Sequence, residues 1–295
     1  MYVFVTGVVF FSLRDNGKRK LIIRILFVPI IIAAVLAAYA VFIEPNWIEV
    51  THLTVKSENF TPELAHLKIV EFSDLHVEKT TGFREERLVK IINNLAPDII
   101  LFNGDFVNSE EGLAPSIRIF KRLKAKYGIY AVLGNTDYFF FYNENRLVEA
   151  LKAAGVDVLL HDSRKLDLDG GGTLWIVGLS YGYNGTEHVD RAFAGIPARA
   201  PKIFLMHVPE VADTAGIADY GPQLMLAGHT HGGQFGIPFL RKYSAYAERS
   251  KYMAGIFAVQ RIALYVNRGI GMKTRKVRLL CRPEITVIHL ENNSN

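Results

Sequence analysis

The sequence predicts a layered α/β domain that follows a single membrane-spanning helix. Three features support this prediction: an uncharged apolar run near the start of the chain, short apolar segments that alternate with helical patterns, and polar residues just after several of those segments. Alternating strands and helices are typical of α/β layers. Polar side chains at the ends of strands indicate a ligand site at one edge of the sheets.

The apolar run covers residues 25–43 and contains no charged residue. As a helix it would span roughly 28 Å, at about 1.5 Å per residue, which is close to the thickness of a bilayer core. Pro29 near its start is tolerated in a membrane helix. Four basic residues within residues 18–24 precede the run and predict a cytoplasmic N-terminal side. We therefore expect a single-pass anchor with the domain on the outer side.

Three alternatives to this topology remain open. A basic segment, an apolar run and the small-x-small motif Ala38-Tyr39-Ala40 also fit a cleaved signal peptide. The run could be a buried core helix, although it is longer and more evenly apolar than most. Residues 1–13 are apolar too, and pairing with the run as a hairpin would place the domain in the cytoplasm. The full spanning length favours an uncleaved anchor.

The charge of the chain gives little support to nucleic-acid binding. The formal net charge is +5, but residues 1–44 carry five basic and two acidic groups. These residues contribute +3, which leaves +2 for the other 251 residues. Most of the basic excess therefore lies beside the apolar run, where it indicates the orientation of a membrane helix. The single cysteine, Cys281, excludes an internal disulfide framework and a thiolate cluster for zinc, and we expect it to be a small buried residue.

The chain divides into an N-terminal cytoplasmic or membrane-proximal segment (1–24), the anchor (25–43) and one large domain (47–291). Two helices are predicted where apolar residues recur at helical spacing, at Leu88–Leu95 and Leu147–Ala154. Eight strands are predicted in the domain: Leu67–Ser73, Ile99–Asn103, Gly128–Leu133, Leu174–Val177, Lys202–Met206, Leu224–Ala227, Ile262–Val266 and Ile285–Leu290.

Five of the predicted strands end next to Asp, Asn or His residues. The residues are Asp74, His76, Asp105, Asn135, His207, His229 and His231. Because side chains from different strands converge at the carboxyl ends of a parallel sheet, we expect these seven to lie together. Residues i and i+2 of an extended chain project to one side, so the pairs at 74/76 and 229/231 can each send two side chains to one place. Glycines such as Gly104 and Gly134 let the backbone turn sharply beside them.

These residue types predict a metal site. Carboxylate, amide and imidazole groups without thiolate suit divalent Mn, Fe or Zn. One Asp-x-His or Gly-Asp motif is common by chance, and a lone histidine is usually a surface or core residue. Seven candidate ligands that follow predicted strands in order are difficult to explain in that way.

Five motifs follow one another along the chain: Asp74-x-His76, Gly104-Asp105, Gly134-Asn135, His207 and Gly228-His229-Thr230-His231. This series resembles the calcineurin-like metallophosphoesterases. The longer string at 228–234, with 267–271 (NRGIG) and 281–285 (CRPEI), is similar to the membrane-associated YkuE/YaeI-type bacterial branch. The resemblance covers roughly residues 47–290. It implies a four-layer αββα sandwich and a location in the bacterial inner (cytoplasmic) membrane.

The resemblance also implies a pair of divalent metal ions as cofactors. One ion would be held by Asp74, His76 and His231, and the other by Asn135, His207 and His229. Asp105 would bridge the two, at the roughly 3.5–4 Å separation typical of such sites. Two cations lower the pKa of a shared water and neutralise charge on a phosphate. The implied substrate is therefore a phosphodiester or a pyrophosphate, lipid-linked or soluble.

One residue departs from the pattern of the family. Thr136 follows Asn135, where the family commonly has a histidine that helps the leaving oxygen. A hydroxyl cannot carry positive charge or act as a useful acid at pH 7. This departure favours substrates with good leaving groups. His161 and His188 could replace the missing imidazole, or could be structural or exposed.

Asp105, Asn135 and Arg268 are the predicted catalytic residues. Arg268 follows a predicted strand and could clamp a substrate phosphate through its planar guanidinium, or could form a surface ion pair. The aromatic run Tyr138–Tyr142 follows the third motif. If exposed, the run would suit acyl chains or a bilayer surface, and if buried it would cap the core.

Three functions fit these observations. The first is a binuclear metal-dependent phosphohydrolase that acts near a membrane. The second is a lipid-pathway pyrophosphatase of the UDP-diacylglucosamine type, because such relatives also lack the histidine at this position. The third is a membrane-bound module that binds metal but has lost catalysis. No nucleic-acid partner is expected.

Overall fold

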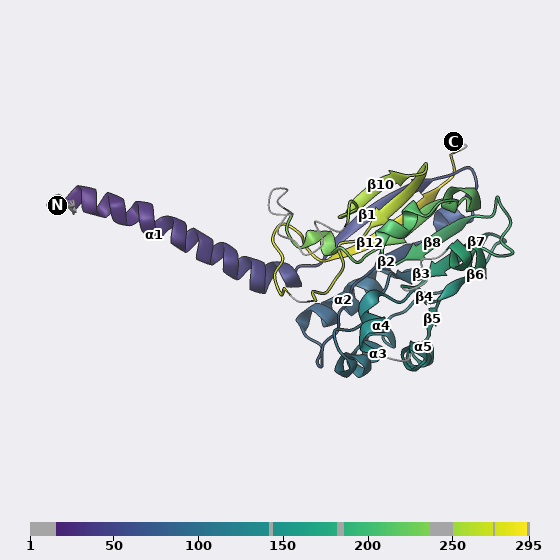
Figure 1. The fold of residues 1–295 in the computed structure, drawn as a ribbon, viewed down its shortest axis with the longest axis horizontal. Coiled ribbons are helices and arrows are strands. Elements are labelled where there is room, and N and C mark those ends of the chain that lie inside the picture. Colours follow the sequence, from purple (N-terminus) through teal and green to yellow (C-terminus); the bar gives the residue numbers. More distant parts are fainter. Residues whose placement is uncertain (1–15, 142–143, 182–185, 237–249, 274, 294–295) are drawn as a thin grey trace, which may run out of the picture.

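Two six-stranded sheets form the domain, and helix α1 projects away from them (Figure 1). The computed structural model describes residues 16–141, 144–181, 186–236, 250–273 and 275–293. The first sheet has the strand order β1-β12-β2-β3-β4-β5 and the second β10-β11-β9-β8-β7-β6. The strands of the first sheet are β1 (Glu49–Lys56), β2 (Ile69–Phe72), β3 (Ile99–Phe102), β4 (Ile129–Ala131), β5 (Val156–Val158) and β12 (Glu284–Glu291). Those of the second are β6 (His161–Asp167), β7 (Thr173–Leu179), β8 (Lys202–Met206), β9 (Leu224–Ala227), β10 (Gly255–Val259) and β11 (Ile262–Val266).

Most neighbouring strands in both sheets run parallel. β2, β3, β4 and β5 are parallel in the first sheet, and β7, β8, β9 and β11 are parallel in the second. The carboxyl ends of parallel strands lie at one edge of their sheet. The loops after β2, β3 and β4 therefore share one edge, and so do the loops after β8 and β9.

Side chains of the central strands alternate between two cores. In β3, Ile99 and Leu101 pack into the core between the sheets, whereas Ile100 and Phe102 pack under helices. Helices α2 (Phe83–Leu95), α3 (Leu113–Phe120) and α5 (Glu144–Ala153) cover the outer face of the first sheet, and α6 (Thr186–Ala192) packs on the second. This four-layer αββα arrangement confirms the predicted fold class.

All eight predicted strands are present. The four strands that the sequence pattern does not predict, β1, β5, β6 and β10, are the edges of the two sheets. β6 reads HDSRKLD and contains no continuous apolar run, because one side of an edge strand faces solvent. β8 and β9 are buried along their full length and have the bounds that their apolar runs predict. The two predicted helices correspond to α2 and α5.

The N-terminal apolar run is helical. α1 (Asn16–Ala38) continues through a π-helical turn, η1 (Tyr39–Ile43), and a 3₁₀ turn, η2 (Glu44–Asn46). Within the described ranges, one helical stretch is long and apolar enough to cross a membrane, Phe27–Asn46, with a mean hydropathy of 2.4. It is only 11% buried, so its apolar side chains do not pack into a protein core as those of a buried core helix would.

The end of the apolar helix is fixed to the domain by hydrogen bonds. Glu44 is fully buried, and its carboxylate accepts hydrogen bonds from the backbone N–H groups of Leu280 and Cys281. The backbone N–H of Arg278 donates to the carbonyl of Ala40 at 3.0 Å. Buried charged groups need such partners because an unpaired one costs several kcal/mol. The helix and the domain are therefore joined by a buried polar contact rather than by a loose linker.

Candidate metal centre

The structure brings all seven predicted side chains together. They lie on the loops after β2, β3 and β4 of the first sheet and after β8 and β9 of the second. The ligand site thus forms where the carboxyl edges of the two sheets meet. Five of the seven residues are at most 2% exposed, and the other two, Asn135 and His229, are partly buried: the five are Asp74, His76, Asp105, His207 and His231.

One group of donor atoms forms around His231. Its Nε2 lies 3.0 Å from Nε2 of His76 and 3.4 Å from Oδ1 of Asp74. Nε2 of His76 lies 3.4 Å from Oδ2 of Asp105. The donor atoms of Asp74, His76 and His231 all lie within 4.8 Å of one another, so one cation can contact all three.

A second group of donor atoms forms around Asn135. Its Oδ1 lies 3.1 Å from Nε2 of His207 and 2.9 Å from Nδ1 of His229. Nε2 of His207 lies 3.4 Å from Oδ1 of Asp105. The two oxygens of the Asp105 carboxylate therefore face different groups, Oδ2 the first and Oδ1 the second.

The backbone around these side chains is strained. Five candidate ligands have positive φ angles between 47° and 71°: Asp74, His76, Asp105, His229 and His231. Such conformations cost on the order of 1 to 3 kcal/mol each in non-glycine residues and persist where a site requires them. The expected extended geometry at 74/76 and 229/231 is thus wrong. The side chains of each pair converge because both residues are left-handed, not because the chain is extended.

Two glycines leave room for the carboxylates. A Cβ atom on Gly134 would lie 2.2 Å from Oδ1 of Asp105, and one on Gly228 would lie 2.4 Å from Oδ2 of Asp74. Real Cβ contacts do not occur at such distances, because van der Waals repulsion rises steeply. Any larger residue at these positions would displace a candidate ligand.

A buried carboxylate that the sequence analysis does not select fixes the loops in place. Asp137 accepts hydrogen bonds from the backbone N–H groups of Gly134, Asp105 and Phe106 at 2.8 to 3.0 Å. Burial, and then the neighbouring Asp105, raise the pKa of Asp137 to about 7. Its sequence signal is the Gly-x-x-Asp spacing of a capping box at the start of α4 (Asn135–Phe140).

Hydrogen bonds also orient the candidate ligands themselves. The backbone N–H of Thr136 donates to Oδ1 of Asp105 at 2.8 Å, and the hydroxyl of Ser73 lies 2.5 Å from Oδ2 of Asp74. Nδ1 of His207 lies 2.7 Å from the carbonyl of Asn103, which turns Nε2 towards the site. Such outer contacts set the ring orientation and tautomer of metal-binding histidines.

The charge state of the histidines fits a cation site. Burial lowers the pKa of His76 to about 4 and of His229 to about 3, and it lowers the pKa of His231 as well. Burial also disfavours charge on His207, but the Asp105 carboxylate outweighs it and raises the pKa of His207 to about 9. Neutral imidazoles whose nitrogens approach to 3.0 Å are well suited to share a metal ion.

Arg268 lies beside the site, but its guanidinium forms ion pairs with two glutamates. Its side chain passes Gly232, and its guanidinium lies 3.0 Å from Glu284 and 2.9 Å from Glu49. The predicted contact with a substrate phosphate stays a prediction and competes with these two carboxylates.

His161 and His188 pack against each other, with ring centroids 5.3 Å apart. Their predicted role as replacements for an imidazole at position 136 is likewise untested.

The aromatic run is divided between core and surface. Phe141 is 3% exposed, and Tyr138 and Phe140 are partly buried against the same core. Phe139 is 77% exposed on α4, and Tyr142 lies outside the described residues. Neither predicted alternative therefore describes the run as a whole.

Cys281 is buried, as predicted.

The motifs can now be compared with known proteins. The model of the calcineurin-like phosphoesterase family matches residues 67–233, which is more than half of the chain and contains all seven candidate ligands. The chain belongs to the calcineurin-like phosphoesterase family. This membership confirms the resemblance inferred from the motifs, and it makes the chain a metal-dependent phosphoester hydrolase by family.

Three relatives illustrate the range of this branch. The uncharacterized metallophosphoesterase YkuE of Bacillus subtilis is 30% identical over 87% of this chain and 90% of its own length. The phosphodiesterase YaeI of Escherichia coli is 30% identical over 85% of this chain and 92% of its own. The UDP-2,3-diacylglucosamine pyrophosphatase LpxG of Chlamydia trachomatis is 26% identical over 85% of this chain and 91% of its own.

Replacing Gly134 with alanine should weaken metal binding, because the new Cβ displaces the Asp105 carboxylate. We expect the affinity for Mn²⁺, measured by calorimetry, to fall about 10- to 100-fold, as for other changes that misplace a ligand. Gly82→Ala is the matched control, since Gly82 also precedes a helix with an ordinary φ angle and its added Cβ would meet only the end of the Glu85 side chain at 3.3 Å. Equal affinities in both variants would contradict the role of Gly134.

Proposed function

We propose that this protein is a binuclear metal-dependent phosphohydrolase, of the phosphodiesterase or pyrophosphatase type, that acts beside a membrane. The observation that carries the proposal is the orientation of Asp105, whose two carboxylate oxygens face separate groups of donor atoms. A carboxylate placed in this way is suited to bridge two divalent ions of Mn, Fe or Zn. Asp74, His76 and His231 would hold one ion, and Asn135, His207 and His229 the other.

The residues of the chain provide a preorganised frame for hydrolysis. When bound, the two cations would lower the pKa of a water and neutralise charge on the phosphate. Asp137 and the backbone N–H of Thr136 keep the loop and the carboxylate of Asp105 in place, so no rearrangement is needed during the reaction. Asn135 lies between two imidazoles at the open side of the site, where a substrate oxygen can approach it.

The position of Thr136 limits the range of substrates. Its side chain is fully buried, and its hydroxyl has no hydrogen-bond partner among the described residues. An alcohol in this setting supplies no acid for a poor leaving group. Substrates whose leaving group needs no proton, such as pyrophosphates or activated diesters, are therefore favoured.

We further propose that residues 25–43 anchor the domain (47–291) as a single helix in a bacterial inner membrane, with residues 1–24 before it and the domain on the outer side. The basic residues ahead of the helix support this orientation. The hydrogen bond from the backbone N–H of Arg278 to the carbonyl of Ala40 supports an uncleaved helix over a signal peptide, because cleavage after Ala40 would remove this contact from the domain.

A lipid-linked pyrophosphate is a second candidate substrate. The likeness to LpxG, whose name specifies UDP-2,3-diacylglucosamine, supports this class of substrate at low identity. Phe139 supports it independently, because this ring is 77% exposed on the helix that begins with the candidate ligand Asn135. An exposed aromatic ring beside the site can contact an acyl chain.

The Asp105→Asn variant tests whether the protein is an enzyme. With Mn²⁺ and an activated aryl phosphodiester, we expect turnover by the wild-type chain and a loss of at least about 100-fold in kcat for the variant, because a neutral amide cannot bridge two cations. Asp167→Asn, at an exposed position on β6, should keep full activity. No turnover by the wild type on any diester or pyrophosphate would favour the third reading, a metal-binding module without catalysis.

Thr136→Val tests the account of the leaving group. Valine has the shape of threonine and keeps the backbone N–H that binds Asp105, so the metal site should remain intact. We expect kcat to fall steeply with leaving-group pKa in the wild type, and to change by less than about threefold in the variant for every substrate. Thr54→Val, at an exposed position on β1, is the control. A loss in Thr136→Val confined to alkyl esters would show that the hydroxyl assists departure.

A further inference from the structure

A groove lies where the apolar helix enters the domain. It has a volume of about 400 Å³ and is lined by Phe42, Ile43, Asn46, Trp47, Phe83 and Arg87. The first four residues belong to the end of the helix and the turn after it, and the last two to the first turns of α2. The groove is therefore continuous with the candidate membrane span, Phe27–Asn46.

The walls of the groove are apolar and face outwards. Phe42 is 72% exposed, Ile43 54%, Trp47 46% and Phe83 67%. Soluble surfaces rarely collect so many exposed large apolar side chains in one place. Tryptophan and other aromatic residues are instead typical of the membrane–water interface. The guanidinium of Arg282 lies 4.9 Å from the centre of the Trp47 ring and keeps that ring in place.

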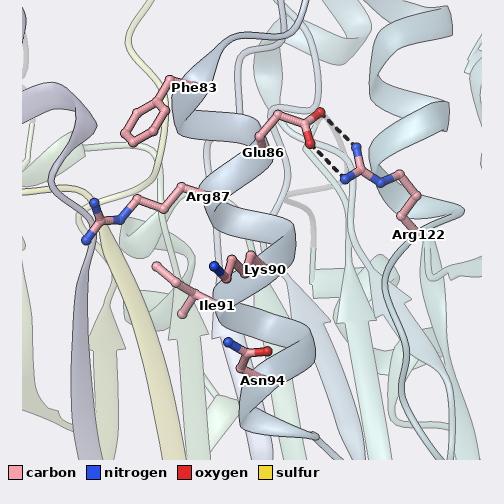
Figure 2. Close-up of a pocket in the computed structure, with 7 residues that line it drawn as sticks. All are labelled: Phe83, Glu86, Arg87, Lys90, Ile91, Asn94 and Arg122. Atoms are coloured by element: carbon pink, nitrogen blue, oxygen red, sulfur yellow. Dashed lines mark hydrogen bonds and ion pairs between the residues drawn. The ribbon is translucent and has the colours of Figure 1, made fainter.

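The groove adjoins a basic hollow, and the two share Phe83 and Arg87. Arg87 and Lys90 are exposed on α2, and within the described part of the chain neither forms an ion pair. Both line this hollow, which has a volume of about 570 Å³, with Ile91 and Asn94. Figure 2 shows the Arg87 side chain pointing from α2 to the side opposite Glu86 and Arg122.

The acidic residue in this hollow is already neutralised. Glu86 forms a two-pronged ion pair with Arg122, at 2.7 and 2.8 Å (Figure 2). The nearby Arg84 pairs with Glu85 at 2.7 Å, and Arg282 pairs with Glu49. Two positive charges, on Arg87 and Lys90, thus remain without a counter-ion in a hollow that opens beside the membrane helix.

We propose that this groove and the adjoining hollow together form a binding site for an anionic phospholipid of the surrounding membrane. The phosphate lies between Arg87 and Lys90, and the acyl chains follow Phe42 and Ile43 towards the membrane span. Charge complementarity and continuity with the apolar helix favour this occupant over a soluble anion and over a protein partner. A soluble anion would make no contact with the apolar wall. The inference rests on the proposed membrane location, but not on the proposed catalysis.

Quenching by brominated lipids tests the proposal directly. The chain has two tryptophans, so Trp175→Phe leaves Trp47 in the groove as the sole tryptophan, which can be excited selectively over tyrosine at roughly 295 nm or above. The full chain is reconstituted in phosphatidylcholine vesicles that contain an equal fraction of brominated phosphatidylglycerol or brominated phosphatidylcholine. We expect the anionic lipid to quench Trp47 with at least about threefold higher apparent affinity, because basic residues near a membrane surface attract anionic headgroups.

In the same background, Arg87→Gln with Lys90→Gln should reduce this preference to about one. Lys152→Gln with Arg199→Gln removes the same charge from exposed positions outside the groove and should retain it. If the preference for the anionic lipid survives in the Arg87/Lys90 variant, or is lost in both double variants, the proposed lipid site is wrong. Loss of the preference in excess inorganic phosphate would show that the groove takes a free anion instead.

Flotation of the vesicles separates this proposal from the others. A chain that floats with the vesicles but shows no lipid preference contradicts the lipid site alone. A chain that does not float contradicts the membrane anchor, and the lipid site with it. Hydrolysis of a soluble aryl diester should be equal in both double variants, so a loss of activity in the first would indicate damage to the domain rather than loss of lipid.

Discussion

The carboxylate of Asp105 is the constraint on which the candidate site depends. Its two oxygens face donor atoms from both sheets, His76 on one side and His207 on the other. The surrounding structure is arranged to keep this group in position, with Gly134 leaving space for it and Asp137 binding the backbone on both sides of it. A buried carboxylate is costly unless it is paired, which explains why so many polar contacts converge here.

The same region connects the site to the N-terminal helix. The carboxylate of Glu44 binds the backbone N–H of Cys281, and the thiol of Cys281 lies 3.4 Å from the carbonyl of His231. His231 is in turn a candidate ligand with a left-handed backbone. Two contacts therefore lead from the end of the apolar helix to a candidate ligand of the metal centre. The end of the apolar helix and the geometry of the site are thus physically linked.

Much of this arrangement follows from the sequence, and the exceptions have physical causes. The interior strand β8 is buried on both faces and appears as an apolar run, whereas the edge strands β1 and β6 carry polar or charged residues on their solvated sides. The candidate ligands could be selected from the sequence because they follow interior strands. Their left-handed backbone conformation could not be predicted from the sequence, because non-glycine residues adopt it only where tertiary contacts impose it. The spacing of Gly134 and Asp137 indicates their local hydrogen bond, but the bonds of Asp137 to the backbone of Asp105 and Phe106 join distant loops and leave no sequence signal.

The most direct test of the central claim is the electron paramagnetic resonance spectrum of the Mn²⁺-loaded protein, recorded with its metal content. If Asp105 bridges two ions, the protein should hold two Mn²⁺ per chain, and their spectrum should be that of an exchange-coupled pair. A single ion per chain, or two ions with the spectrum of isolated Mn²⁺, would contradict a carboxylate bridge and with it the binuclear site.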